Sequence, residues 1–265
     1  MIKVLKDIKF LRPLFSRFRK GLATILRLQQ LPKSFLRLRT LLLFVKQRNH
    51  FRKKGGVISK YFPILTDFKD SAGNASGHYF HQDLLVAQMI YKSNPIKHLD
   101  IGSRIDGFVA HVASFREIEI LDIRPLSDST HPSIKYKTLD IMSEVEENLS
   151  DSISCLHSIE HFGLGRYGDP IEPNGHRIGF TNLVKMLKPG GTLYISFPIG
   201  LSNEVYFNAH RVFHPLEIFT WGVESLKLKR FDFVDDFGSL KLDVDVFASD
   251  LKPVYGCGIY TFVKI

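Results

Sequence analysis

The sequence has 265 residues, of which 44% are hydrophobic and 24% are charged, and its formal net charge is +9. These proportions are typical of soluble globular proteins, so they exclude a wholly disordered chain and a polytopic membrane protein. Only two cysteines are present, Cys155 and Cys257, which excludes a disulfide framework and a four-cysteine zinc site. The cysteine usage favours a reducing, cytoplasmic setting.

The positive charge belongs to one end of the sequence. Residues 1–54 contain 16 of the 36 Lys and Arg residues and one of the 27 acidic residues, so this segment carries +15 and the remainder −6. A basic stretch of this kind differs from a basic face on a folded domain, and it lacks the interleaved aromatic residues of a base-stacking platform. We therefore expect no nucleic-acid partner.

Residues 1–54 also have helical periodicity. Apolar residues recur three or four positions apart between Val4 and Ile25, and again after Ser34, which is a suitable N-cap for a second helix. The apolar runs are too short to cross a bilayer, and Lys and Arg interrupt every candidate signal sequence. Two interpretations stay open: an amphipathic surface that binds the inner face of an anionic membrane, or a helical hairpin that packs on the body or on a second subunit.

Strands and helices alternate in the rest of the chain. Lys53-Lys54-Gly55-Gly56 predicts a linker, so we place a basic helical extension at residues 1–56 and an α/β domain at 57–265. The alternation predicts a seven-stranded, mostly parallel sheet with helices on both faces. The predicted strands are 97–101, 117–122, 134–139, 152–157, 192–198, 228–235 and 257–264, and the predicted helices are 80–92, 106–115, 177–187 and 214–221.

Acidic residues end the first three predicted strands. Asp100 is followed by Gly102 at a strand-to-helix turn, Asp122 ends the second strand, and Asp140 follows the third. An acid at the end of the second strand accepts hydrogen bonds from a ribose diol, and the start of a helix offers free N–H groups to a ligand. Because ligands bind where parallel strands end, the three aspartates predict a nucleoside site.

Two later segments carry further motifs. Residues 152–163 read SISCLHSIEHFG, a buried strand that ends in polar residues, and residues 183–198 read LVKMLKPGGTLYISFP, a helix end, a turn and an apolar strand. Together with Asp100-x-Gly102 and Asp122, these motifs resemble the class I S-adenosylmethionine-dependent methyltransferases over residues 78–265. The resemblance implies a Rossmann-like α/β fold and S-adenosylmethionine as the cofactor.

A narrower resemblance points to an acceptor. A methyltransferase-like family of unknown function, whose bacterial members are often associated with surface-polysaccharide synthesis, is similar in five segments. This context implies an O-methyltransferase that acts on a sugar or a lipid-linked glycan precursor. The similar segments are GHYFHQDL (77–84), DIGSRIDGF (100–108), DIRPL (122–126), HSIEHFGLGRYGDPI (157–171) and NAHRVF (208–213).

The class I resemblance also implies the residues of a cofactor site. Asp100 and Gly102 would lie at the methionine end, Asp122 would hold the ribose hydroxyls, and Asp140 would face the adenine amine. The other residues expected to line this site are Ser103, Arg104, Ile123, Ile141 and His157.

The glycine loop departs from the usual Gly-x-Gly-x-Gly pattern. It reads Gly102-Ser-Arg104-Ile-Asp106-Gly107, so two side chains stand where glycine is usual. Arg104 is suited to bidentate binding of a carboxylate or a phosphate, which makes a nucleotide sugar the competing ligand.

Transfer of a methyl group to a hydroxyl requires a base. His161 follows the fourth strand and titrates in the useful range, so it is the first candidate, with Glu160 and His210 as the others. A Glu-His pair at this point also serves as a structural or cofactor-side element in the superfamily.

The acceptor is expected to contact the loop after the fourth strand. Residues 162–176 hold several Gly and Pro residues, which predicts a long loop, with Tyr167 and Asp169 as its contact residues. Arg211 would suit a phosphate or uronate on the acceptor.

A metal site and two other functions are weighed beside this interpretation. His78, His81 and Asp83 lie close together in the sequence, but no second cluster is positioned to complete a site, so we predict no metal ion. The altered glycine loop leaves two alternatives open, a catalytically silent scaffold protein and an enzyme that uses a nucleotide sugar.

Overall fold

The computed structural model describes residues 39–126 and 131–265, and the chain divides into two compact units, Met1–Asn74 and Ala75–Ile265. We call the second unit the body. In the sequence, the boundary between the two units follows Asn74, which is 18 residues after Gly56, the last residue of the predicted linker.

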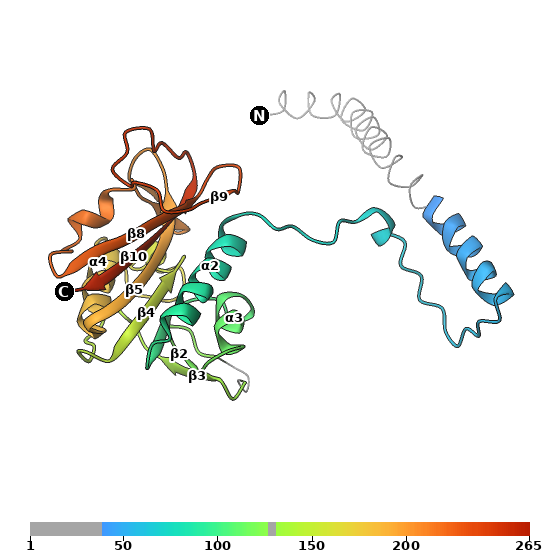
Figure 1. The fold of residues 1–265 in the computed structure, drawn as a ribbon, viewed down its shortest axis with the longest axis horizontal. Helices are drawn as coiled ribbons and strands as arrows, with labels where there is room; N and C mark the ends of the chain where they lie inside the picture. The colour runs from blue at the N-terminus through green and yellow to red at the C-terminus, as the bar shows by residue number, and fades with distance from the viewer. Residues whose placement is uncertain (1–38, 127–130) are drawn as a thin grey trace, which may run out of the picture. The chain divides into compact units, whose positions relative to one another are not determined.

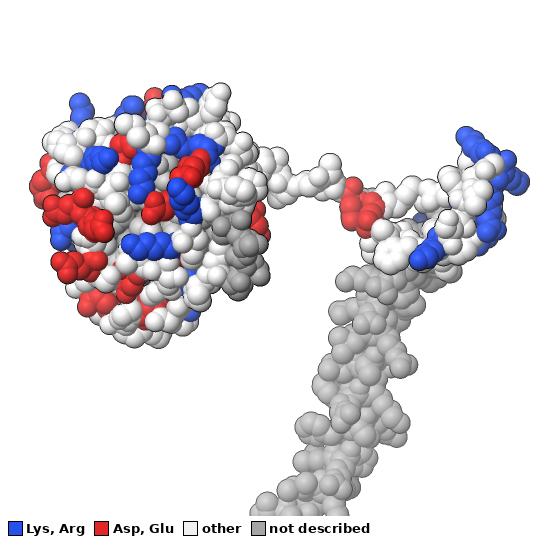
Figure 2. Space-filling view, turned by 90° about the horizontal axis from the view of Figure 1, so that it is seen from below, with Lys and Arg blue, Asp and Glu red and all other residues white. Residues whose placement is uncertain are grey.

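The described part of the first unit is a helix followed by an extended chain. Residues 39–53 are helical, as predicted after Ser34, and a short 3₁₀ helix covers Asp67–Lys69 (Figure 1). The helix predicted from Val4 to Ile25 lies outside the described residues. Lys and Arg side chains gather on residues 39–53, whereas both signs of charge are mixed on the body (Figure 2). In the described ranges, no helix combines the length and apolar character needed to cross a membrane.

The body is built on one twisted sheet. Its strand order is β3-β2-β1-β4-β5-β10-β8-β9, in which β1 to β5 are parallel and β10 runs antiparallel to β5 and β8 (Figure 1). The order of the first five strands is that of a Rossmann-like fold, so the predicted fold class is confirmed. The strands are β1 (His98–Ile101), β2 (Ile118–Asp122), β3 (Ile134–Thr138), β4 (Ser150–Leu156), β5 (Leu187–Ile199), β8 (Leu226–Val234), β9 (Leu240–Lys241) and β10 (Gly256–Lys264).

The strand count differs from the predicted seven. Within the described residues, the main sheet has eight strands, because the two-residue β9 pairs with β8, and β6 (Glu204–Tyr206) and β7 (His210–Val212) form a separate hairpin. Both additions are too short to show a period-two hydrophobic pattern, which explains why the sequence does not reveal them.

Two predicted helices are shorter than expected. The segment predicted as 106–115 is a π-helical turn, Ile105–Val109, followed by α3 (Ala110–Ala113), because Gly107 has non-helical backbone angles. The segment predicted as 214–221 is only a 3₁₀ turn, Glu217–Thr220: Pro215 disfavours a helical conformation of His214, and Gly222, with φ of +91°, ends the turn. The other two predicted helices are α2 (His78–Ser93) and α4 (Gly175–Met186).

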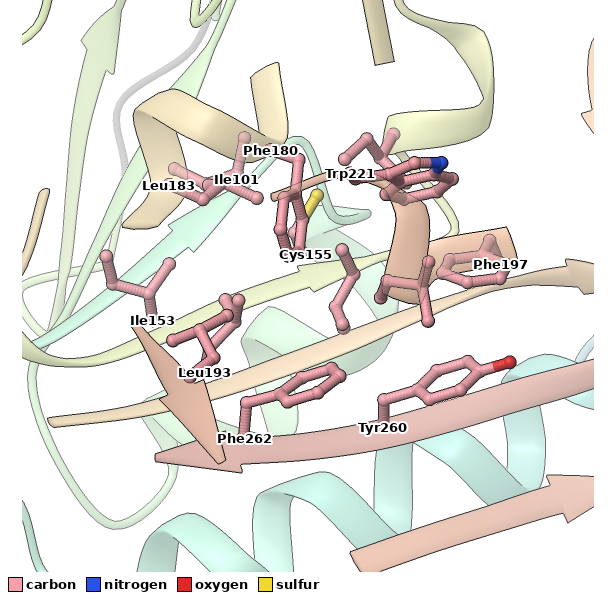
Figure 3. Close-up of a cluster of buried hydrophobic side chains, with 14 of the residues drawn as sticks. Ile101, Ile153, Cys155, Phe180, Leu183, Leu193, Phe197, Trp221, Tyr260 and Phe262 are labelled. Carbon is pink, nitrogen blue, oxygen red and sulfur yellow. The ribbon is translucent and has the colours of Figure 1, made fainter. Parts of the chain in front are cut away.

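Helices cover both faces of the sheet and create two hydrophobic clusters. One cluster packs α2 and α3 against the sheet, and the other packs α4 and Trp221 against the opposite face (Figure 3). Strands buried on both faces must be apolar along their length, as β10 is. Phe197 lies within an aromatic group. The centre of its ring is 5.1 Å from the ring centre of Tyr260, 5.2 Å from that of Phe213 and 5.5 Å from that of Trp221.

Phe197→Ala tests this cluster. Because the ring is fully buried, its removal should lower the free energy of unfolding by about 3–5 kcal/mol, measured by urea denaturation. Phe237→Ala removes a ring that is 90% exposed and should change stability by less than about 0.5 kcal/mol. Equal effects of the two substitutions would contradict the assignment of Phe197 to the core.

Candidate functional site

Two adjoining cavities lie where the parallel strands end. The narrow cavity, of about 60 Å³, is lined by the predicted residues Gly102, Asp122, Ile123, Asp140, Ile141, His157, His161, Tyr167 and Asp169. The wide cavity, of about 620 Å³, is lined by the predicted residues Gly102, Ser103, Arg104, His157, Glu160, His161, Tyr167 and His210. Five residues line both: Gly102, Arg124, His157, His161 and Tyr167. The predicted residues Asp100 and Arg211 line neither of these two cavities.

The Asp100 side chain holds the loop that follows β1. The carboxylate is fully buried and accepts hydrogen bonds from the Ser103 N–H at 3.0 Å, the Ser103 hydroxyl at 2.8 Å and the Ser154 hydroxyl at 2.5 Å. Burial raises the pKa of Asp100 to about 6, against the opposing effect of these hydrogen bonds. Both carboxylate oxygens thus accept hydrogen bonds from protein groups. Asp100 affects the site by holding the loop after β1 and does not line either cavity.

Gly102 allows the chain to turn at the end of β1. Its φ of +72° favours glycine, and a Cβ atom there would lie 2.3 Å from the Ser158 hydroxyl. The turn therefore brings the backbone after β1 close to the backbone after β4.

Arg104 and Asp106 replace the usual glycines with an ion pair. The guanidinium donates to both Asp106 oxygens, at 3.1 and 2.9 Å, and both side chains are mostly exposed. Arg104 lines the wide cavity from the rim, so the pair adds polar surface to the loop without filling it.

Arg124 covers the acid at the end of β2. It donates to both carboxylate oxygens of Asp122, at 2.9 and 2.5 Å, and its guanidinium lies 4.6 Å from the centre of the Tyr167 ring. Tyr136 donates a hydrogen bond from its hydroxyl to the Arg124 carbonyl oxygen. Arg124 thus narrows the cavity in front of Asp122 and closes it toward the loop that carries Tyr167.

Asp140 faces the same narrow cavity from the end of β3. One of its carboxylate oxygens accepts a hydrogen bond from the Met142 N–H at 2.9 Å. Ile123 and Ile141 add apolar surface to the lining of this cavity. The combination of a carboxylate and apolar walls is suited to a flat, partly polar ring system.

His157 stands at the end of β4 between the two cavities. Its φ is +47°, and its Nδ1 lies 2.8 Å from Glu160 Oε1. Burial alone would lower the pKa of His157, but the charges of Cys257 and Glu160 outweigh burial and raise it well above its usual value. Within the described residues, His157 Nε2 and Glu160 Oε2 are buried without hydrogen-bond partners.

His161 is oriented as a base would be. Its Nδ1 lies 2.7 Å from the Ala209 carbonyl oxygen, so Nδ1 is the protonated nitrogen and Nε2 carries the free electron pair. Burial lowers the pKa of His161, which keeps the ring neutral at neutral pH. Glu160 is almost fully buried and engaged with His157, so it is a poorer candidate.

His210 lies beside His161 in the lining of the wide cavity. The ring centroids of His161 and His210 are 6.4 Å apart, and His210 Nε2 lies 3.3 Å from the Tyr255 hydroxyl. Burial lowers the pKa of His210 as well. The wall therefore presents two imidazoles and a phenol to the cavity, all able to exchange hydrogen bonds with an acceptor.

The loop after β4 is held from inside by Arg211. This side chain is buried and donates hydrogen bonds to the carbonyl oxygens of Glu160, Phe162 and Pro173. The predicted role of Arg211 at the acceptor does not fit this position, because the side chain is committed to the loop and lines neither cavity.

Tyr167 and Asp169 occupy the outer part of this loop. The Asp169 carboxylate accepts hydrogen bonds from the N–H groups of Gly165 and Tyr167, both at 3.1 Å, and so fixes the turn that presents the Tyr167 ring. The ring reaches both cavities, whereas Asp169 lines only the narrow one.

Sequence reasoning assigns no role in the site to Arg124, Tyr255 or Cys257, and it places His78 only in a cluster with His81 and Asp83. Arg124 follows Asp122 by two positions, and this spacing could have indicated the ion pair. The other three come from α2 and from the start of β10, and they reach the end of β4 only through the packing of these elements.

The comparisons with known proteins give little sequence likeness. The model of one family, described as Caenorhabditis protein of unknown function, DUF268, matches residues 131–243. A search of curated proteins finds no match.

Several solved structures are similar to part of this chain. The chain is 16% identical to the N-methyltransferase NodS from Bradyrhizobium japonicum WM9 in complex with S-adenosyl-L-homocysteine, with 71% of this chain and 88% of that chain covered and a TM-score of 0.48. For the 1,6-didemethyltoxoflavin-N1-methyltransferase of Burkholderia thailandensis, the identity is 12%, the coverage 69% and 78%, and the TM-score 0.47. For the [4+2]-cyclase SpnF, the identity is 11%, the coverage 69% and 81%, and the TM-score 0.48. Likeness at this level concerns the fold and does not identify a reaction.

The raised pKa of Asp100 predicts a specific dependence of stability on pH. Because the folded chain binds this proton more tightly than the unfolded chain, the stabilising contribution is complete below about pH 3.8 and is lost as the pH rises through about 6. Relative to Asp100→Asn, which does not titrate, the wild-type free energy of unfolding should fall by up to about 3 kcal/mol between pH 4 and 7.

Urea denaturation of both proteins at several pH values measures this difference. Asp250→Asn, on the surface, should instead follow the wild type with a constant offset. A constant difference between Asp100→Asn and the wild type would contradict the raised pKa.

Proposed function

We propose that the protein is an S-adenosylmethionine-dependent O-methyltransferase. The observation that carries the proposal is the arrangement at the ends of β1, β2 and β3: a turn at Gly102 beside two cavity-facing carboxylates, Asp122 and Asp140. This arrangement, together with the class I sequence motifs, supports a nucleoside site with a second cavity adjoining it.

The residues present fit this cofactor in chemical type. Asp122 offers carboxylate oxygens to ribose hydroxyls, and Asp140 lines the same cavity as the apolar side chains of Ile123 and Ile141, where an adenine ring would bind. The backbone at Gly102 and Ser103 borders the wide cavity, in which the methionine end would lie. When bound, the cofactor supplies an activated methyl group, so the protein needs only to align the acceptor and accept its proton.

The fit requires one rearrangement. Small-molecule sites typically have volumes of about 300–1,000 Å³, whereas the cavity in front of Asp122 has about 60 Å³. Arg124 and Tyr167 narrow this cavity, and Arg124 occupies both Asp122 oxygens. Nucleoside binding therefore displaces Arg124 from Asp122, at the cost of a half-exposed ion pair of about 1 kcal/mol or less.

His161 is the proposed base for an acceptor hydroxyl. Its free Nε2 lies at the boundary of the two cavities, and its neutral state at physiological pH allows it to accept a proton. His210 and Tyr167 lie on the surrounding wall and are proposed to orient the acceptor. A sugar or glycan precursor is the proposed acceptor class, supported by the family resemblance and by the many hydrogen-bonding groups of the wide cavity.

Peripheral membrane binding is the proposed role of the basic segment, residues 1–54. Its described part carries Arg39, Lys46, Arg48, Arg52 and Lys53 without an acid, and Leu42 and Phe51 are exposed on the same helix. Basic residues near an anionic bilayer contribute about 1 kcal/mol each, and exposed apolar side chains insert into the interface.

Calorimetric titration with S-adenosylhomocysteine tests the cofactor. The wild type should bind it, and Asp122→Ala should weaken binding by about 100-fold or more, because two charge-assisted hydrogen bonds are lost. Arg124→Ala should tighten binding by up to about fivefold, since Asp122 is then free before binding.

The controls separate this site from general damage to the fold. Asp250→Asn should bind as the wild type does, and UDP-glucose should not compete. Absence of S-adenosylhomocysteine binding by the wild type would refute the proposed cofactor. Binding of UDP-glucose in its place would favour the nucleotide-sugar alternative. Binding of neither compound would favour a scaffold protein.

Vesicle sedimentation tests the basic segment. The full chain should bind vesicles that contain phosphatidylserine, bind less in high salt, and bind weakly to pure phosphatidylcholine. A chain lacking residues 1–54 should stay in the supernatant with both vesicle types. Equal sedimentation of the two chains would favour the hairpin interpretation.

A further inference from the structure

Three side chains from distant parts of the sequence meet beside the wide cavity. His78 begins α2, His157 follows β4, and Cys257 lies near the start of β10. One potential ligand atom from each residue lies within 4.8 Å of the other two. The sequence shows only the cluster His78, His81 and Asp83, whereas the fold turns His78 toward His157 and Cys257.

His157 is arranged as a ligand of a metal ion. Its Nδ1 lies 2.8 Å from Glu160 Oε1, so Nδ1 is the donor, and Nε2 is the nitrogen that would bind an ion in exchange for its proton. The ring is 5% exposed, and Nε2 is buried without a hydrogen-bond partner among the described residues. A carboxylate that holds the far nitrogen of a histidine is the usual second partner of a metal-bound imidazole.

The other two groups complete a set of donors around this nitrogen. The His78 ring stacks on the His157 ring, with centroids 5.4 Å apart and planes 11° from parallel. Cys257 is fully buried, and its Sγ lies 3.6 Å from the Gln82 side-chain oxygen. The Gln82 oxygen also accepts a hydrogen bond from the Ser196 hydroxyl, and this bond holds the Gln82 side chain beside Cys257.

We propose that His78, His157 and Cys257 bind a divalent transition-metal ion of the zinc type. Two imidazoles and one thiolate are ligands that Zn²⁺ prefers, and three protein ligands leave a fourth position for an exchangeable group. Zinc bonds of about 2.0–2.3 Å place tetrahedral ligand atoms roughly 3.3–3.8 Å apart. The present separation is at most 4.8 Å, so metal binding requires the stacked His78 and His157 rings to turn until the plane of each passes through the ion.

The fourth position of the ion faces the wide cavity. His78, His157 and Glu160 line that cavity, whereas Cys257 lies behind them in the core. An oxygen of the acceptor, or a water molecule, would complete the coordination, and a metal-bound hydroxyl has a lowered pKa. This second step depends on the proposed function, because it assigns the ion to the acceptor side of the methyltransferase site; metal binding itself does not.

Titration of the metal-free protein with Co²⁺ tests the site directly. The full chain, freed of any polyhistidine tag and treated with a chelator, should bind one Co²⁺ ion with a thiolate-to-cobalt charge-transfer band and the intense visible bands of four-coordinate cobalt. Zn²⁺ should displace the Co²⁺ and abolish both features, as expected from the order of affinities at such sites.

Matched variants assign the ligands. Cys257→Ser should lose the charge-transfer band and bind Co²⁺ at least about 100-fold more weakly, while Cys155→Ser, at the other buried cysteine, should keep both. His78→Ala should lose the four-coordinate spectrum, and His81→Ala, on the same helix, should retain it. Glu160→Gln should keep the spectrum but weaken Co²⁺ binding by about 10–100-fold, as expected for a positioning residue.

Two results would overturn the proposal: the absence of stoichiometric Co²⁺ binding by the folded wild type, or a charge-transfer band that survives in Cys257→Ser. Circular dichroism of each variant shows whether a loss reflects unfolding. If Cys257→Ser does not fold, the charge-transfer band of the wild type and its loss on alkylation of Cys257, located by mass spectrometry, still decide the question.

Binding of S-adenosylhomocysteine is measured on the same metal-free and metal-loaded samples. Binding of the nucleoside without Co²⁺ binding would refute the metal site alone. Co²⁺ binding without nucleoside binding would refute the proposed methyltransferase function and leave the metal site in place.

Discussion

The parallel pairing of β4 with β1 on one side and β5 on the other is the constraint on which the site depends. Parallel strands all end at the same edge of the sheet, and helices cover both faces of these strands. Polar side chains that follow the strand ends therefore line the two cavities, whereas polar groups buried within the strands, such as Ser154 of β4, are hydrogen-bonded inside the protein. The buried Asp100 carboxylate adds a direct link, because it joins Ser103 in the first loop to Ser154 on β4.

At this edge of the sheet, His157 lines both cavities. Its left-handed backbone conformation turns the chain after β4, and Glu160 holds its ring between the two cavities. Arg211 stabilises the same region from the interior, because its three hydrogen bonds to backbone carbonyls hold the loop that carries Tyr167. The geometry of the cavities thus depends on buried polar groups, among them Arg211, which lines neither cavity.

The two cavities differ in their chemistry. Carboxylates and apolar side chains line the narrow cavity, whereas imidazoles and tyrosines dominate the wide one. In the proposed function this division separates the cofactor's nucleoside from the acceptor, with His161 at the boundary. The Arg104–Asp106 pair shows how the loop after β1 accommodates the loss of two glycines: each side chain neutralises the other at the exposed rim, and the turn itself needs only Gly102.

The sequence by itself determined the Rossmann-like fold, the main strands and the acids that end them, because hydrophobic periodicity and turn residues act over a few neighbouring positions. It placed Asp122, Asp140 and His161 at the edge where the parallel strands end, since each lies at the end of a recognisable strand or a few residues after it. Only the tertiary structure decided that Arg211 turns inward, that Arg124 covers Asp122, and that His78 and Cys257 meet at His157. These contacts join residues up to 179 positions apart, from His78 to Cys257, and no local pattern records which surfaces will pack together.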